Sequence, residues 1–325
     1  MIMYIQVLAG FVLLVGAAEI LVRGAVSLAD RFGISPLVIG MTVVAVGTSA
    51  PELVVSLNAV FEGSSGLAIG NLVGSNTANV LLIFGATCLL KPIVEHPGSS
   101  RLDGWVLIGG TALFIGLCLY GDLGQLAGII LLFAFFGFLA ASYWRDSHDP
   151  AAIEEVAQEV EDFQGEHKPL YVALLMIVAG LVGLGYGADL LVQGGVQIAR
   201  IYGVSEEVIG LTLFALGTSL PELATCLVAA FRGKPAVAIG NVIGSNLFNL
   251  LGVGGVLGLV ANIPVPGQIL SFDLWIMFGA TAVFFPVLVL GWRVPRVTGA
   301  VLLLCYIGYV SIQAYGVENT MALLG

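Results

Sequence analysis

Residues 42–53, TVVAVGTSAPEL, return at 212–223 as TLFALGTSLPEL, so the same apolar segment carries a glutamate in each half of the chain. On insertion scales, a carboxylate at membrane depth costs about 3 kcal/mol, and other estimates are higher. An ionisable residue kept at such a place is a functional hypothesis by default. Glu52 and Glu222 are therefore the first candidates for a functional site.

The two glutamates belong to a longer internal repeat. They are 170 positions apart, and the same spacing relates the residues around them without a gap. Upstream, EILVRG from Glu19 matches DLLVQG from Asp189, and downstream Asp103 and Trp105 match Asp273 and Trp275. Asp103 and Asp273 stand where a span is predicted to begin, a position typical of helix-start residues. A repeat from about residue 18 to about residue 105 indicates duplication of one unit.

The composition is that of an integral membrane protein. Of 325 residues, 58% are hydrophobic and 10% charged, and the mean hydropathy is +1.04, which leaves too little polar surface for a soluble globule. About ten apolar segments are long enough to span a bilayer as helices: 3–25, 35–61, 66–90, 102–120, 123–143, 169–199, 205–230, 235–262, 271–291 and 298–318. Abundant glycine without short alternating strands favours an all-α protein over a barrel.

The charged residues predict the orientation. Eight of the acids lie in one polar linker, 144–168, and account for most of the net charge of −10. When successive loops are assigned alternately to the two sides of the membrane, nearly all lysines and arginines lie on one side and only Arg200 lies on the other. The side with nearly all of the basic residues is expected to be cytoplasmic. The pattern predicts a multi-pass cell-membrane protein with both termini outside and a cytoplasmic linker. Repeats of five helices, 1–143 and 169–325, then enter the membrane in opposite senses, as an inverted repeat.

Each repeat carries two polar blocks. In G-T-S-x-P-E-L, which begins at Gly47 and at Gly217, glycine and proline interrupt a helix and release carbonyls. In G-N-x-x-G-S-N-x-x-N, which begins at Gly70 and at Gly240, serine and the last asparagine lie four apart on one helical face. Hydroxyls, carbonyls and carboxylates are the ligands that hard cations prefer. The blocks therefore predict an oxygen-rich chamber with two negative charges.

At these blocks the sequence resembles the calcium:cation antiporter superfamily, and within it the prokaryotic type of sodium/calcium exchanger. The resemblance covers essentially the whole chain. It implies a fold of ten helices in two inverted repeats, with broken helices at the ion site. It also implies that Na⁺ entry drives Ca²⁺ export by electrogenic, alternating-access exchange.

The resemblance also implies ligands. Glu52 and Glu222 correspond to shared Ca²⁺ and Na⁺ carboxylates, and the carbonyls of Thr48 and Thr218 to further calcium ligands. The sodium ligands implied are Ser49, Ser219, Ser75 and Ser245, with the carbonyls of Ala45 and Ala215. Many relatives have an aspartate where this chain has Asn79 or Asn249, so two carboxylates remain, enough to neutralise one Ca²⁺. The exchange ratio stays open.

Other functions stay in view. Proton-coupled calcium exchange would use the same glutamates, with structural roles for the serines, and a passive cation channel could use the same chamber. A closed site with two carboxylates suits binding better than fast release. No enzyme motif or nucleic-acid footprint is found in the sequence. We expect no cofactor, a monomer in the lipid bilayer, and Ca²⁺ and Na⁺ as the transported partners.

Overall fold

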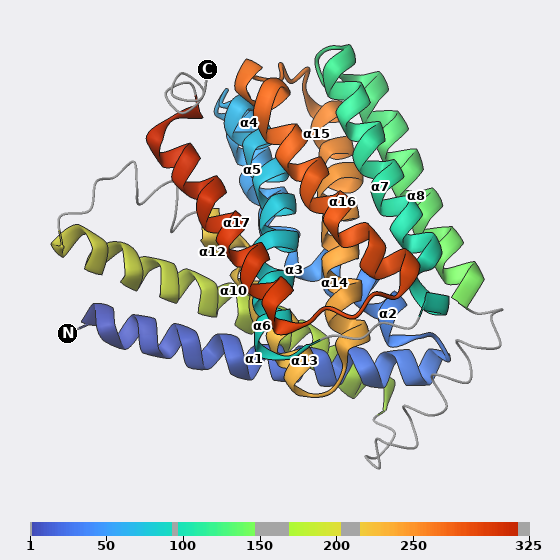
Figure 1. The fold of residues 1–325 in the computed structure, drawn as a ribbon. Coiled ribbons are helices and arrows are strands. Elements are labelled where there is room, and N and C mark those ends of the chain that lie inside the picture. The colour runs from blue at the N-terminus through green and yellow to red at the C-terminus, as the bar shows by residue number, and fades with distance from the viewer. Residues whose placement is uncertain (1, 93–96, 147–168, 203–214, 318–325) are drawn as a thin grey trace.

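The computed structural model describes residues 2–92, 97–146, 169–202 and 215–317, and almost all of them are helical (Figure 1). The first half contains α1 (Ile2–Phe32), α2 (Pro36–Ile39), the π-helix η1 (Gly40–Val44), α3 (Ala45–Thr48), α4 (Ala50–Phe61), α5 (Ser65–Ala78), the π-helix η2 (Asn79–Phe84), α6 (Gly85–Leu90), α7 (Pro97–Tyr120) and α8 (Gln125–Asp146). The second contains α10 (Leu170–Ile201), α12 (Ala215–Thr218), α13 (Leu220–Phe231), α14 (Pro235–Leu247), the π-helix η4 (Phe248–Val253), α15 (Gly254–Val260), the π-helix η5 (Ile269–Asp273), α16 (Leu274–Leu290) and α17 (Arg296–Tyr315).

The all-α membrane fold is confirmed. Within the described ranges, eight helices are long and apolar enough to cross a membrane, and there are nine if the segment from α2 to α4, which bends by 41°, is one span. The predicted span 205–230 is described only from Ala215 onward, as α12 and α13. Most of the predicted linker 144–168 lies outside the described residues. The order of elements in the two halves is consistent with the predicted repeat.

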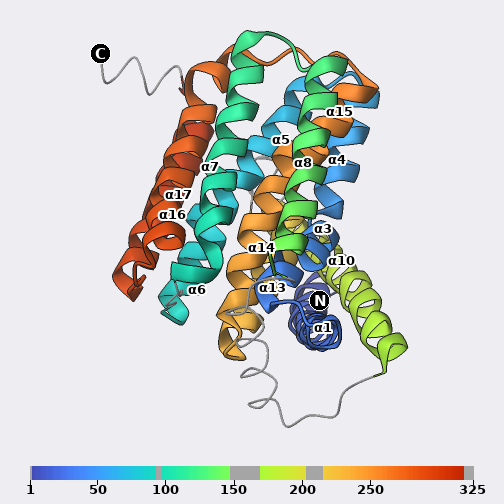
Figure 2. The same cartoon turned by 90° about the vertical axis from the view of Figure 1, so that its right-hand side faces the viewer.

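Two continuous helical paths form the centre of the molecule. One runs from α5 through η2 to α6, and the other from α14 through η4 to α15. In their most apolar windows, 78% and 83% of the residues are buried, against 17% to 44% for α7, α8, α16 and α17. The latter four are therefore the peripheral helices, packed against the central paths (Figure 2).

The first helices of the two repeats form a separate pair. Figures 1 and 2 show α1 and α10 side by side beneath most of the other helices, which they cross steeply. The pair is antiparallel, because Gly10 meets Leu191 whereas Gly24 meets Ile177. A Cβ built on Gly10 would lie 2.7 Å from the carbonyl oxygen of Gly187. Small residues thus allow a close backbone approach between the two helices.

The downstream aspartates correct one expectation. Asp103 lies inside α7, which begins at Pro97, and its carboxylate accepts bonds of 2.9 and 3.0 Å from Arg145 instead of capping a helix. Asp273 stands immediately before α16 but makes no side-chain cap bond. It accepts bonds from Tyr309 and Gln313 instead. Both acids connect neighbouring helices because a buried carboxylate needs donors, and the nearest donors lie across the helix interface.

Candidate functional site

The G-T-S-x-P-E-L blocks break their helices as the sequence predicts. Ser49 separates α3 from α4 with φ −89° and ψ 8°, and Ser219 separates α12 from α13 with φ −88° and ψ 1°. The following prolines, Pro51 and Pro221, stand at the first turn of the new helix. Since proline has no N–H, the carbonyl four residues earlier loses its helical partner and is free for another ligand.

Both glutamates lie in the first turn after the break. Glu52 belongs to α4 and Glu222 to α13, and each is 1% exposed. The positive end of the helix dipole favours a negative charge at this position. Two broken helices therefore hold two carboxylates inside the protein, at the place where the sequence predicts them.

Each block faces the glutamate of the other repeat. The hydroxyl of Ser49 donates a 2.7 Å hydrogen bond to Oε1 of Glu222, across 173 positions of sequence. On the other side, the side chain of Thr218 lies beside Glu52. Because Ser49 stands directly before α4, which holds Glu52, its bond to Glu222 brings the two acids near enough to share one site.

The G-N-x-x-G-S-N-x-x-N blocks lie on the central helices. Ser75 and Ser245 are 5% and 0% exposed on α5 and α14, and Asn79 and Asn249 are buried one turn further on. The π-helix η2 begins at Asn79, and η4 begins one residue before Asn249. Such π-turns occur frequently at functional sites.

Several polar atoms of this region are buried without a hydrogen-bond partner. They are Oε2 of Glu52, Oε2 of Glu222, the hydroxyls of Thr218, Ser219 and Ser245, Oδ1 of Asn76, Oδ1 of Asn79, Nδ2 of Asn246 and both polar atoms of Asn249. Leaving such a group unpaired costs roughly 1–3 kcal/mol, so each one calls for an explanation. Most are oxygens, and bound cations would satisfy them. The donor set fits hard cations such as Ca²⁺ and Na⁺.

The charge of the site is limited to two carboxylates. Among the described residues, no group of three or more histidine, cysteine or acidic side chains is placed to hold a metal ion. Asn79 and Asn249 supply amides where a third acid could stand. The pair Glu52 and Glu222 is therefore matched in charge to one divalent cation.

Asn241 and Asn246 join the site only through the tertiary structure. Oδ1 of Asn241 accepts a 3.2 Å bond from the hydroxyl of Thr48, and its Nδ2 donates to Sγ of Cys226 at 3.4 Å. Oδ1 of Asn246 accepts a 3.0 Å bond from Nδ2 of Asn79. The Thr48–Asn241 and Asn79–Asn246 bonds connect one repeat to the other. The asparagines inside the second polar block are the only sequence signal for these contacts.

Asn71, which is the equivalent of Asn241 in the first repeat, has a local role. Nδ2 of Asn71 donates to the carbonyl oxygen of Glu52 at 3.3 Å and to Oγ of Ser56 at 3.0 Å. It therefore ties α5 to α4 beside the site. Ala45 and Ala215 begin α3 and α12, and the carbonyl of Ala45 accepts the backbone N–H of Ser49 at 2.9 Å.

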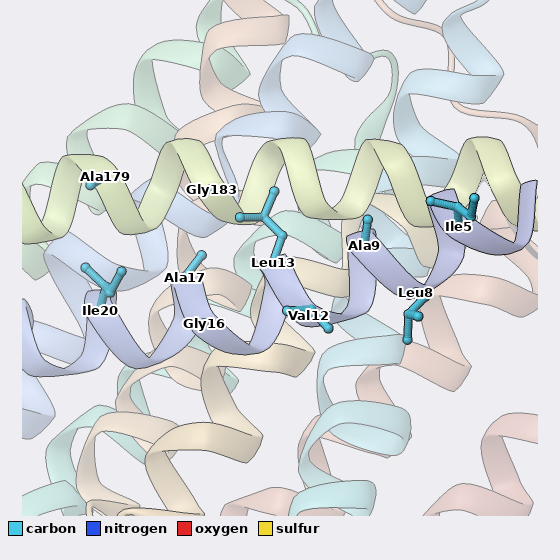
Figure 3. Close-up of a pocket in the computed structure, with 10 residues that line it drawn as sticks. All are labelled: Ile5, Leu8, Ala9, Val12, Leu13, Gly16, Ala17, Ile20, Ala179 and Gly183. Carbon is cyan, nitrogen blue, oxygen red and sulfur yellow. The ribbon is translucent and has the colours of Figure 1, made fainter. Parts of the chain in front are cut away.

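A separate hollow lies between α1 and α10. Its volume is about 530 Å³, and all ten of its lining residues are apolar or glycine. Figure 3 shows Leu13 and Ala17 of α1 directed toward Gly183 and Ala179 of α10. With no polar side chain in its lining, this hollow lacks the donors that a cation needs and is distinct from the glutamate site.

Comparison with known proteins agrees with this geometry. Residues 2–144 and 172–315 match the family described as sodium/calcium exchanger protein. The chain is 39% identical over 308 residues to CaxA, a candidate antiporter of Alkalimonas amylolytica, covering 94% of this chain and 96% of the relative. It is 30% identical to the sodium/calcium exchanger MaX1 of Methanosarcina acetivorans, covering 96% and 98%.

A solved structure of the sodium-calcium exchanger NCX_Mj, soaked with Na⁺ and Sr²⁺, superposes with a TM-score of 0.82 at 28% identity. The match covers 96% of this chain and 98% of that one. The resemblance inferred from the polar blocks is thus confirmed, both for the family and for the fold.

Proposed function

Because the chain belongs to the sodium/calcium exchanger protein family, and is thus a membrane cation antiporter, we propose that it exports Ca²⁺ in exchange for Na⁺ by electrogenic alternating access. The observation that carries this proposal is the buried pair Glu52 and Glu222, each with an unpartnered carboxylate oxygen. Residues of both polar blocks carry further unpartnered hydroxyl and amide oxygens.

The ligand roles follow from the type of oxygen. We assign Ca²⁺ to the two carboxylates, with the carbonyls at Thr48 and Thr218 completing its shell. We assign Na⁺ to the serine hydroxyls at positions 49, 219, 75 and 245, to the carbonyls of Ala45 and Ala215, and to the same carboxylates. Asn79 and Asn249 contribute neutral oxygens. Hydroxyl and carbonyl oxygens suit Na⁺ because they bind it without over-neutralising a single charge.

Exchange then follows from competition for shared ligands. Two carboxylates cannot hold Ca²⁺ together with a full set of Na⁺, because the excess positive charge would be repelled in a poorly hydrated site. One type of ion must leave before the other enters. Movement of the α1 and α10 pair against the rest of the protein would expose the site alternately to the two sides.

The test is uptake of ⁴⁵Ca²⁺ into proteoliposomes that are preloaded with Na⁺ or with choline. Valinomycin and K⁺ set the voltage, and a separate arm applies a pH gradient without Na⁺. The proposal expects uptake that needs internal Na⁺ and responds to voltage. Uptake driven by the pH gradient alone would assign the protein to proton-coupled exchange and leave the serines structural. Flux without any counter-ion gradient would indicate a channel.

A further inference from the structure

A contact at one end of α13 links the α1 and α10 pair to the rest of the protein. Glu19 of α1 binds Nε of Arg232 through Oε2 at 2.6 Å, and Nε of Arg23 through Oε1 at 2.5 Å. Arg232 is the C-cap residue that directly follows α13. The side chain of Glu19 is 19% exposed, whereas those of the two arginines are more than half exposed. One carboxylate therefore bridges its own helix and α13.

The packing around this contact is not symmetric. In an inverted repeat, α1 corresponds to α10 and α13 corresponds to α4, so a symmetric molecule would have two equivalent interfaces. In this conformation α1 packs along α13, whereas α10 makes no comparable contact with α4 among the described residues. Exchanging the conformations of the two repeats would produce the opposite arrangement, in which α10 packs along α4. This second arrangement gives the pair a defined alternative position.

The sequence does not support an equivalent ion pair in that alternative arrangement. Moving by 170 positions, Glu19 becomes Asp189, Arg23 becomes Gln193 and Arg232 becomes Glu62. Asp189 accepts a 2.8 Å bond from Gln193 on its own helix. Packing of α10 along α4 would bring Asp189 toward a second carboxylate, not toward a cation. Like charges at that distance repel.

We propose that the ion pair between Glu19 and Arg232 is a one-sided latch. It stabilises the conformation in which α1 covers the end of α13 and thereby closes the entrance on that side, which the charge pattern assigns to the cytoplasm. Within the part of the chain that the structure describes, the opposite entrance has no corresponding latch, because the equivalent residues Asp189 and Glu62 are both acidic. The chain therefore biases its own conformational equilibrium. The inference rests on the proposed alternating access.

The latch can be tested by distance measurements between spin labels, without any transport. Phe32 and Phe231 are exposed near the ends of α1 and α13, and their repeat equivalents, Tyr202 and Phe61, are exposed on the opposite side. Each pair is replaced by cysteine in a background that carries Cys305→Ser, because Cys305 is exposed and Cys88, Cys118 and Cys226 are buried.

The variant Glu19→Gln is expected to lengthen distances between positions 32 and 231 and to shorten those between 61 and 202. The ratio of the two states should change roughly two- to fivefold, the size that partly exposed ion pairs support. Arg232→Gln should give the same change, and the double variant no more than either alone. Arg23→Gln is the matched control, because it removes the partner of Glu19 within α1 and leaves the contact with α13.

A variant that adds an ion pair separates the effect of the latch from a general loss of stability. Glu62→Arg provides Asp189 with a cation and should shift the ratio in the opposite direction. Unchanged distances in both Glu19→Gln and Glu62→Arg would overturn the latch. If the wild type shows no Na⁺-driven ⁴⁵Ca²⁺ uptake while the distances still shift, the proposed exchange fails and the latch stands.

Discussion

The hydroxyl of Ser49 donates a 2.7 Å hydrogen bond to Oε1 of Glu222, so a residue of the first repeat binds the carboxylate of the second. The bond between Thr48 and Asn241 crosses the same boundary at 3.2 Å. A half of the molecule could not form this arrangement alone. The site is therefore a property of the assembled pair of repeats, and single substitutions in either repeat should affect the whole site.

Neutralising either glutamate should abolish calcium transport. In Glu52→Gln and Glu222→Gln one of the two buried charges is lost, so a divalent cation is no longer balanced in the site. The measurement is Na⁺-dependent ⁴⁵Ca²⁺ uptake. Asp122→Asn is the control, since Asp122 is exposed between α7 and α8 and accepts a bond from Asn262. Normal uptake by Glu52→Gln would refute the site assignment.

Ser75→Ala should weaken the dependence on Na⁺ before it affects Ca²⁺. The variant removes a neutral oxygen that we assign to Na⁺ and leaves both carboxylates in place. The concentration of Na⁺ that gives half-maximal exchange should rise about fivefold, which corresponds to about 1 kcal/mol for one ligand. Ser311→Ala serves as the comparison, because Ser311 is exposed and bonds only its own helix at Ile307. Equal effects of both variants would argue for a structural serine.

Asn241→Ala should lower the apparent affinity for Ca²⁺ without changing the charge of the site. Asn241 holds the hydroxyl of Thr48, whose neighbouring carbonyl we assign to Ca²⁺. Losing one buried hydrogen bond costs on the order of 1 kcal/mol, so the half-saturating Ca²⁺ concentration should rise about fivefold. Asn262→Ala, an exposed asparagine, should leave it unchanged. An unaltered Ca²⁺ affinity in Asn241→Ala would contradict the positioning role.

Gly10→Ala should destabilise the protein, whereas Gly16→Ala should not. A Cβ at Gly10 would lie 2.7 Å from both Gly187 O and Leu191 N of α10, and one at Gly16 would meet no atom within 4 Å. Forcing the α1 and α10 backbones apart costs about 1–3 kcal/mol by analogy with overpacked cores. Thermal unfolding in detergent measures the difference. Equal melting temperatures would show that the helix pair tolerates separation.

Arg145→Gln should lower stability by about 2 kcal/mol, less than the loss for a fully buried pair because Arg145 is 24% exposed. The cause is Asp103, whose 1% exposed carboxylate would lose its arginine. Adding Asp103→Asn should recover most of the loss, as it removes the buried charge. Arg101→Gln changes an exposed arginine near the same helix end and is the control. No recovery in the double variant would indicate that the arginine acts through packing alone.

The sequence by itself determined the membrane class, most of the spans, the 170-residue repeat and the two glutamates. These features depend on local composition and spacing, which hydropathy and helical periodicity report directly. The helix breaks at Ser49 and Ser219 were equally predictable, because proline and glycine act on their own backbone. The helix-start expectation failed at Asp103, whose partner Arg145 lies on another helix.

Only the tertiary structure decided which repeat faces which glutamate, how α1 pairs with α10, and that Glu19 reaches Arg232. The partners are 173 positions apart in the bond between Ser49 and Glu222, and 213 positions apart in the bond between Glu19 and Arg232. No periodic pattern records such a pairing, because it results from how helices pack against each other and from where small residues permit close approach. The asymmetry between the two repeats is likewise visible only in the folded arrangement, because the unequal residues Glu19 and Asp189 act through partners on other parts of the chain.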